Sequence, residues 1–328
     1  MLINFIKHNR AISIFFLPVA IAAFWIYGFI NPSVPNVEYA TPMFKAIISR
    51  LKDYPFLLTI ISSVLVISEA VFINYLVRKN EIIDTTTYLP ALVYIVLMSL
   101  QPEMLSLHPI VLANFFLLFA LYKLMQTYKQ ETAYSEAFDT GLFISMASIF
   151  YMPSVIFVFI LWIGLIIIRP FIWREWIISI MGFATPWIFV AFYYFWTNSL
   201  GELQTDIISN TFFLQEKSSK SISLSLNNYL QLGILILIAG FAIGRFLIDL
   251  GKSTVRIRNN NFLLVYFGIL SVVTIFIAPA YTILFLSFLS IPFSIFISGY
   301  FLLAKKQWIA EILFLLLIIS VFINQIFQ

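Results

Sequence analysis

Carboxylates placed beside or inside apolar runs are the side chains of this sequence most able to do chemistry. Glu38 lies eight residues after the uncharged run 11–30 and just before a segment of mixed character, 42–54. A carboxylate in that position could act as a general base, or help to bind a divalent cation next to a phosphate. The alternative is a solvated loop carboxylate, and sequence chemistry alone favours that alternative.

A carboxylate and an imidazole occur together in the segment PEMLSLHP (102–109), which contains Glu103 and His108. Side chains of these two types could supply an acid and a base, or ligands for a metal ion. Their spacing of five residues matches no strong metal-binding motif, because such motifs need fixed helical offsets. A polar loop with one histidine is therefore the favoured alternative.

Glu69 is the most unusual carboxyl, because it interrupts the apolar run ISSVLVISEAVFINYLV (61–77). It precedes Arg78 by nine residues, which puts it roughly 13 Å inside the apolar region if the run is helical. A carboxyl in hydrocarbon costs several kcal/mol unless it is paired, protonated or facing a cavity. Two interpretations stay open: a proton or ion relay group, or an internal tie that fixes helix packing.

Segment 42–54 has apolar residues at helical spacing on one side and Lys45, Ser49 and Lys52 on the other. This pattern predicts a short amphipathic helix in the headgroup plane of a membrane. It could hold anionic lipid or a lipid-linked phosphate, or it could be an ordinary interfacial helix. The candidate ligands for a lipid phosphate, in this segment and in a later polar loop, are Lys45, Arg50, Lys52, Lys217 and Lys220. For the last two, a solvated loop is the favoured alternative.

Two further groups of charges need only local explanations. Arg245 and Asp249 are four residues apart near a helix end, where a local ion pair is expected. Arg169, Arg174 and Glu175 flank a tight turn in IIIRPFIWREW.

The composition indicates what must position these residues. Hydrophobic residues make up 62% of the chain and charged residues 10%, with a mean hydropathy of +0.99. Soluble domains usually hold about 25% charged residues. The apolar residues come in runs of roughly 20, the length needed to cross a bilayer as a helix. No cysteine is present, which excludes disulfides and thiolate chemistry, and the net charge of +4 is no signal for nucleic acid.

The runs predict an all-α, polytopic transmembrane helical bundle of about eleven spans in the bacterial inner (plasma) membrane. We expect the first span to remain uncleaved, because no small-residue cleavage site follows it. The predicted spans are approximately 11–30, 55–77, 87–101, 109–126, 139–151, 153–168, 176–196, 228–248, 262–279, 281–303 and 308–327. The boundary near Pro153 could instead be a kink or a re-entrant turn.

The basic residues predict the orientation of these spans in the membrane. With a cytoplasmic N-terminus, 14 of the 19 Lys and Arg residues fall on cytoplasmic segments and five on exterior segments. The C-terminus is then exterior. Two exterior loops are long, 31–54 and 197–227. On this architecture, those loops would most naturally build a catalytic site, and it would lie on the exterior face.

The order of features resembles the membrane module of the GT-C superfamily of integral-membrane glycosyltransferases. Three segments carry the resemblance: VEYATPMF (37–44), SLHPIVLANFFLLFALYKL (106–124) and FDTGLFISMASIFYMPSVIFVFIL (138–161). It covers residues 1–196 as a seven-span module, which leaves 197–328 as an exterior loop and four C-terminal spans. The turn RPFIWREW also resembles a polytopic membrane protein family of Bacteroidota that has no assigned activity.

The first resemblance implies a transferase that uses polyprenyl-phosphate-linked sugars at the exterior leaflet. Glu38 would then be the base, Glu103 and His108 would assist it or bind a divalent cation, and the basic residues of the outer loops would hold the lipid phosphate. This sequence departs from the superfamily in having a single acid near the start of the first loop, and His108 where an acid is expected. It also lacks the large soluble domain of oligosaccharyltransferases.

Two other classes of function remain as alternatives. One is a transporter or channel in which Glu69 is the intramembrane relay group. The other is a non-enzymatic assembly partner in the cell envelope.

Overall fold

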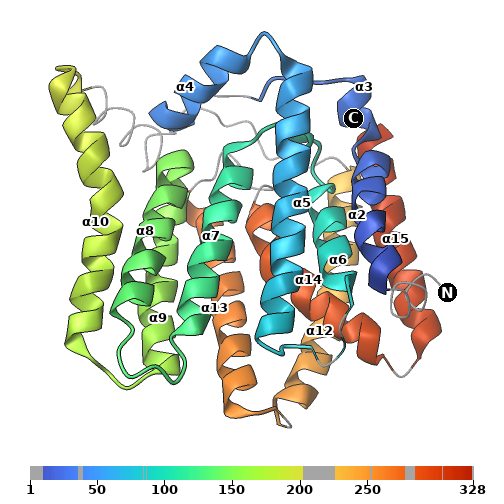
Figure 1. Ribbon diagram of the computed structural model, residues 1–328. Helices are drawn as coiled ribbons and strands as arrows, with labels where there is room; N and C mark the ends of the chain where they lie inside the picture. Colours follow the sequence, from blue (N-terminus) through green and yellow to red (C-terminus); the bar gives the residue numbers. More distant parts are fainter. Residues whose placement is uncertain are drawn as a thin grey trace.

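The computed structural model describes residues 10–35, 40–83, 85, 87–201, 226–251, 253–277, 285–304 and 306–326. Within these residues every regular element is helical, as predicted (Figure 1). The elements are α2 (Arg10–Phe24), α3 (Ile26–Ile30), α4 (Pro42–Leu51), α5 (Pro55–Lys79), α6 (Leu89–Met98), η1 (Pro102–Leu105), α7 (Pro109–Gln126), α8 (Tyr134–Phe150), η2 (Met152–Phe157), α9 (Val158–Ile168), α10 (Trp173–Trp196), α12 (Leu226–Leu250), α13 (Val255–Ile277), α14 (Phe285–Leu303) and α15 (Gln307–Ile326).

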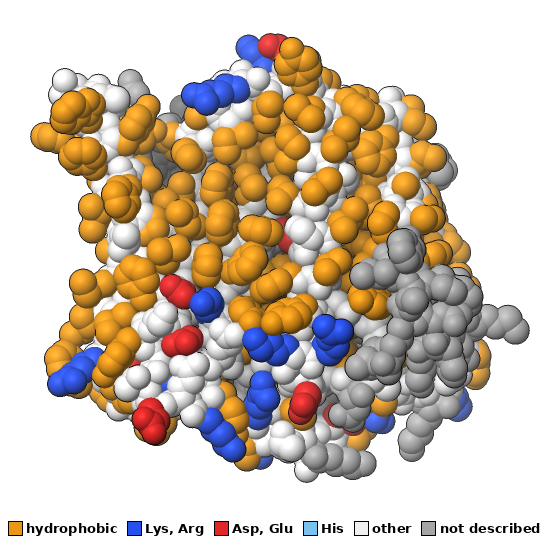
Figure 2. Space-filling view, in the orientation of Figure 1, with side chains coloured by type: hydrophobic (Ala, Val, Ile, Leu, Met, Phe, Trp, Pro, Cys, Tyr) orange, Lys and Arg blue, Asp and Glu red, His pale blue; other side chains and the backbone are white. Residues whose placement is uncertain are grey.

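The long helices run back and forth between two ends of the molecule (Figure 1). α4 lies across one end, which we call the α4 end. The connections from α5 to α6, α7 to α8, α9 to α10 and α12 to α13 lie at the other end, which we call the basic end. Lys and Arg side chains gather near the basic end, and a broad hydrophobic band separates them from the few on α4 (Figure 2).

Six helices in the described residues are long and apolar enough to cross a membrane: α5, α7, α10, α12, α14 and α15. The chain is therefore a multi-pass helical membrane protein. α6 has only 10 residues, which corresponds to about 15 Å of helix, half the thickness of a hydrocarbon core. The count of about eleven spans and the orientation of the termini remain predictions.

The half-length helix α6 lies inside the bundle. All ten of its residues are buried, and it packs against α5 on one side and α14 on another. A single hydrophobic cluster extends through it from Leu17 to Val321. Helices from the two ends of the chain therefore share one core.

Donors from distant helices satisfy the carbonyl oxygens of Ser99 and Leu100, the two residues that follow α6. Gln231 of α12 and Asn324 of α15 each donate to the Leu100 carbonyl oxygen, at 3.1 and 2.8 Å. Gln325 donates to the Ser99 carbonyl oxygen at 3.2 Å. The last carbonyls of a helix have no partner within it and are costly to leave unpaired in a membrane. We call Gln231, Asn324 and Gln325 the amide clamp.

Close backbone contact joins α8 to α10. A Cβ on Gly141 would run into the Ser179 carbonyl oxygen, and a Cβ on Gly182 would run into that of Phe138. Small residues of this kind allow membrane helices to approach closely. α8 ends at Phe150 and the short 3-10 helix η2 follows it, so the break that the sequence predicted near Pro153 is a turn.

A buried ion pair ties together two turns at the basic end. Arg169 and Glu175 lie 3.0 Å apart between Nη2 and Oε1. The same Glu175 oxygen accepts from the Ala133 amide at 3.0 Å, and Arg169 donates to the Thr127 and Glu131 carbonyl oxygens. The α9–α10 turn is thereby fixed to the α7–α8 turn.

Candidate functional site

Glu69 lies in the middle of α5, and none of its surface is exposed. It is ten residues from the helix end at Lys79, which is about 15 Å along the axis. The apolar sequence around it makes α5 the most hydropathic of the candidate spans. The structure thus places a carboxyl deep within a membrane-spanning helix, as the sequence predicted.

The hydroxyl of Tyr94 is the hydrogen-bond donor to this carboxyl. Tyr94 Oη lies 2.8 Å from Glu69 Oε2. Asn114 of α7 adds its side-chain amide, with Nδ2 3.5 Å from Tyr94 Oη and 2.9 Å from the Ser287 carbonyl oxygen of α14. Four helices, α5, α6, α7 and α14, therefore meet at one polar cluster, which we call the Glu69 cluster (Glu69, Tyr94, Asn114 and Ser287).

Two acceptor oxygens in this cluster are left over. Glu69 Oε1 and Asn114 Oδ1 are buried and have no hydrogen-bond partner among the residues that the structure describes. Buried polar atoms are nearly always paired, so each exception needs an explanation. A carboxyl without a cationic partner, with one spare acceptor of its own and another on Asn114, suits a site that takes up a proton or a small cation.

A multivalent metal is poorly matched to the cluster. Within the described parts of the chain, no group of three or more His, Asp or Glu side chains could hold a metal ion. Mg²⁺ and Ca²⁺ need several oxygen ligands, usually including carboxylates. The single carboxyl of Glu69 is better suited to a proton.

The structure gives Glu103 and His108 different environments. Glu103 is exposed on η1, whereas His108 is 4% exposed and caps the start of α7. His108 Nδ1 accepts from the Ile110 amide at 3.3 Å. Burial lowers the pKa of His108 from 6.5 to about 3, so the imidazole is neutral at ordinary pH.

α4 confirms the predicted amphipathic helix. Phe44 and Ile48 are buried beneath it, while Arg50 and Lys52 are exposed and Lys45 is half-buried. The hydroxyl of Thr41 donates to the Phe150 carbonyl oxygen at 2.9 Å and fixes the start of α4 against the end of α8. Glu38, Lys217 and Lys220 lie outside the described residues.

The partners of Glu69 were not singled out from the sequence. Tyr94 and Asn114 each lie in an apolar stretch, LPALVYIVLM and PIVLANFFLL. A polar side chain inside such a stretch is a weak signal for an interior contact. The sequence does not reveal which helices meet, so it could not pair them with Glu69.

The architecture defines a multi-pass membrane protein built around a buried carboxyl. The chain belongs to a family of unknown function, DUF6427, whose model matches residues 40–328. The match includes Glu69, Tyr94 and Asn114. Comparison with curated proteins and with solved structures gave no match.

Proposed function

We propose that this protein is a proton-coupled membrane transporter in which Glu69 binds and releases the proton. The observation that carries the proposal is the unpaired Oε1 of a fully buried carboxyl inside a spanning helix. Ionisable groups in membrane spans are expensive and usually mark a substrate, ion or proton pathway.

The surroundings of Glu69 support reversible protonation. The Tyr94 hydroxyl stabilises the charged carboxylate through one hydrogen bond, while complete burial stabilises the neutral acid. A permanently ionised structural carboxyl would need a fixed cation, and none contacts Glu69 among the described residues.

The test is proton flux into liposomes that contain the purified protein and a trapped pH-sensitive dye, driven by an imposed membrane potential. We expect Glu69→Gln to lose most of the flux, because the amide cannot exchange a proton. The matched control is Glu131→Gln, which makes the same change at an exposed loop residue and should behave as the wild type.

A second readout does not depend on a transported substrate. Infrared difference spectroscopy across a pH titration should show a protonated carboxyl band that is absent from Glu69→Gln and displaced in Tyr94→Phe. If a folded Glu69→Gln variant keeps the proton flux of the wild type, and its infrared carboxyl band is also unchanged, the proposal is refuted.

A second candidate function follows the resemblance to GT-C glycosyltransferases, with a polyprenyl-linked sugar handled at the exterior leaflet. Its support is the amphipathic helix α4 at one end of the bundle, where Arg50 on the helix and Lys52 just after it are exposed. Glu38 would be the base. Membranes containing Glu38→Gln should then lose sugar transfer from a polyprenyl-phosphate-linked donor, whereas Glu131→Gln should retain it. Equal transfer by both variants would remove this candidate.

A further inference from the structure

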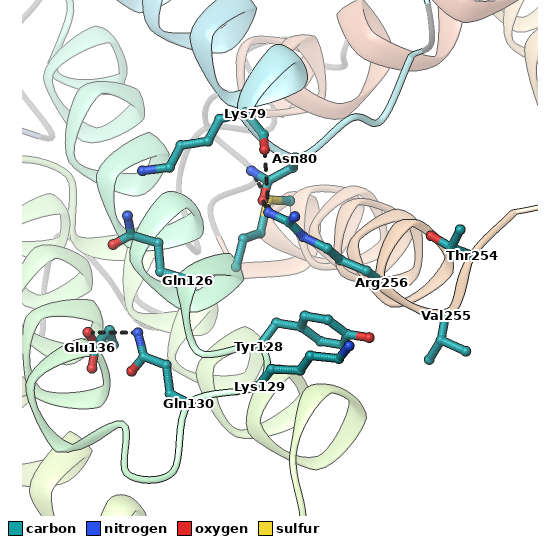
Figure 3. Close-up of a pocket in the computed structure, with 11 residues that line it drawn as sticks. Lys79, Asn80, Gln126, Tyr128, Lys129, Gln130, Glu136, Thr254, Val255 and Arg256 are labelled. Atoms are coloured by element: carbon teal, nitrogen blue, oxygen red, sulfur yellow. Dashed lines mark hydrogen bonds between the residues drawn. The ribbon is translucent and has the colours of Figure 1, made fainter.

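A cavity of about 820 Å³ opens at the basic end of the molecule. Its lining comes from three segments that are far apart in the sequence: the end of α5, the α7–α8 connection and the start of α13 (Figure 3). Lys79, Lys129 and Arg256 each belong to a different one of these segments. Among the described lining residues Glu136 is the one acid, and it accepts a hydrogen bond from Gln130 at 3.2 Å.

Arg256 is held in place within this cavity. Its Nη2 donates to Asn80 Oδ1 at 3.3 Å and to the Lys79 carbonyl oxygen at 3.4 Å. Its Nε is buried and has no hydrogen-bond partner among the described residues. A guanidinium held along one edge, with a further N–H unused, is suited to bind the oxygens of a phosphate.

Aromatic residues hold Lys79 at the rim of the same cavity. Its Nζ donates to the Tyr122 hydroxyl at 2.5 Å and lies 4.8 Å from the centre of the Tyr122 ring. The Tyr75 ring lies 5.6 Å away. Figure 3 shows Arg256 between Lys79 on one side and Tyr128 and Lys129 on the other.

The backbone at Lys129 is in an unusual conformation. Its φ is 59°, in the left-handed region that glycine adopts readily and other residues adopt at a cost. Non-glycine residues in such conformations cluster at functional sites. Glu81, next to the cavity residue Asn80, has a φ of 54°. Two residues at the cavity therefore hold a backbone conformation that is costly for any residue with a side chain.

We propose that this cavity binds a phosphate-bearing anion between Lys79, Lys129 and Arg256. Among the described lining residues, three cations against one acid give the cavity a positive balance, and Thr254 and Val255 add the N-terminal end of α13, which also favours an anion. The phosphate could belong to a lipid headgroup, because the cavity lies where helices end, or to a soluble compound. This inference does not rest on the role of Glu69.

The experiment uses the full chain in detergent and in lipid. Binding of inorganic pyrophosphate to the detergent-solubilised protein tests the soluble source. Native mass spectrometry of protein released from phosphatidylcholine vesicles, with and without phosphatidylglycerol, tests the lipid source. We expect Arg256→Gln to weaken binding of whichever probe binds the wild type by about tenfold, because one charge-assisted hydrogen bond is removed.

Two further variants separate binding from folding. Arg258→Gln removes the same charge two residues away, from a residue outside the cavity lining, and should change the affinity less than twofold. Lys129→Gly should weaken binding while leaving the protein at least as stable as the wild type, because glycine adopts the left-handed backbone without strain.

The outcomes are distinct. Pyrophosphate binding that is weakened by Arg256→Gln supports a soluble phosphate ligand, and retention of phosphatidylglycerol that is weakened in the same way supports a lipid headgroup. Failure of the wild type to bind either probe, or equal binding by Arg256→Gln and Arg258→Gln, would overturn the proposal.

Discussion

Among the residues that the structure describes, two carboxyls are buried to nearly the same degree, Glu69 at 0% exposure and Glu175 at 1%, yet their surroundings are opposite. Glu175 has a guanidinium at 3.0 Å and a backbone amide at 3.0 Å on the same oxygen. Glu69 has a phenol on one oxygen and no partner among the described residues on the other.

The contrast separates a structural acid from one that is free to react. The charge of Glu175 is compensated, so its removal leaves Arg169 buried alone. Glu69 has no charged partner among the described residues, so replacing its carboxyl leaves no buried charge alone. Burial alone therefore does not indicate the role of an acid, whereas the state of its partners does.

The largest effect is expected for Glu175→Gln. Breaking a buried ion pair by removing one partner costs about 3–5 kcal/mol, because the remaining charge stays desolvated. Equilibrium unfolding in mixed micelles measures this loss, with Glu131→Gln as the exposed control. A loss as small as that of the control would mean that Arg169 finds another acceptor.

A smaller effect is expected from pH, through the buried His108. Its pKa is about 3 when folded and 6.5 ordinarily, so between these values the unfolded chain binds a proton that the folded protein does not. Stability is unaffected above about pH 6.5 and falls as the pH is lowered, by about 2 kcal/mol at pH 5.

Unlike the two carboxyls, His108 is a buried base, and it is neutral in the folded protein at ordinary pH. His108→Asn keeps a side-chain acceptor at the helix cap but cannot titrate. Unfolding measured at neutral pH and at about pH 5 should show a smaller difference for His108→Asn than for the wild type. Identical differences would place the responsible proton elsewhere.

Next in size is the amide clamp, where the partners are neutral. Asn324→Leu should destabilise the protein by about 1 kcal/mol, because the Leu100 carbonyl oxygen keeps the hydrogen bond from Gln231. Adding Gln231→Leu should cost more than the first change did, since the carbonyl then has neither donor. Additive losses in the double variant would contradict this shared role.

The smallest effect is expected for Glu69→Gln, the same substitution as the first. The amide keeps an oxygen for the Tyr94 hydroxyl and leaves no charge without a partner, so the change in stability should stay below about 1 kcal/mol. The same unfolding assay measures it. A loss comparable to that of Glu175→Gln would show that Glu69 holds the helices together and would assign it a structural role.

The parts of the fold that depend on local pattern could be predicted from the sequence. The apolar runs 55–77, 109–126 and 176–196 correspond to α5, α7 and α10, because run length is a property of neighbouring residues. The local pair between Arg245 and Asp249 is confirmed, with Nε and Oδ2 3.0 Å apart. Helical spacing also predicted α4.

The long-range pairings could not be predicted. From the sequence, Arg169 and Glu175 are only charges that flank a turn, because their burial depends on carbonyls of the α7–α8 connection. The cavity around Arg256 combines segments whose proximity is set by helix packing. For the same reason the sequence identifies Glu69 as an unusual carboxyl but does not identify Tyr94 and Asn114 as its partners.

The amide clamp has a consequence for the order in which the protein is made. The Leu100 carbonyl finds its donors 131 and 224 residues later in the chain. A ribosome therefore delivers α6 to the bilayer long before the groups that complete its end have been synthesised. Until then that end must be kept hydrated or be sheltered by the insertion machinery, so the assembly of the interior finishes only when the last helix arrives.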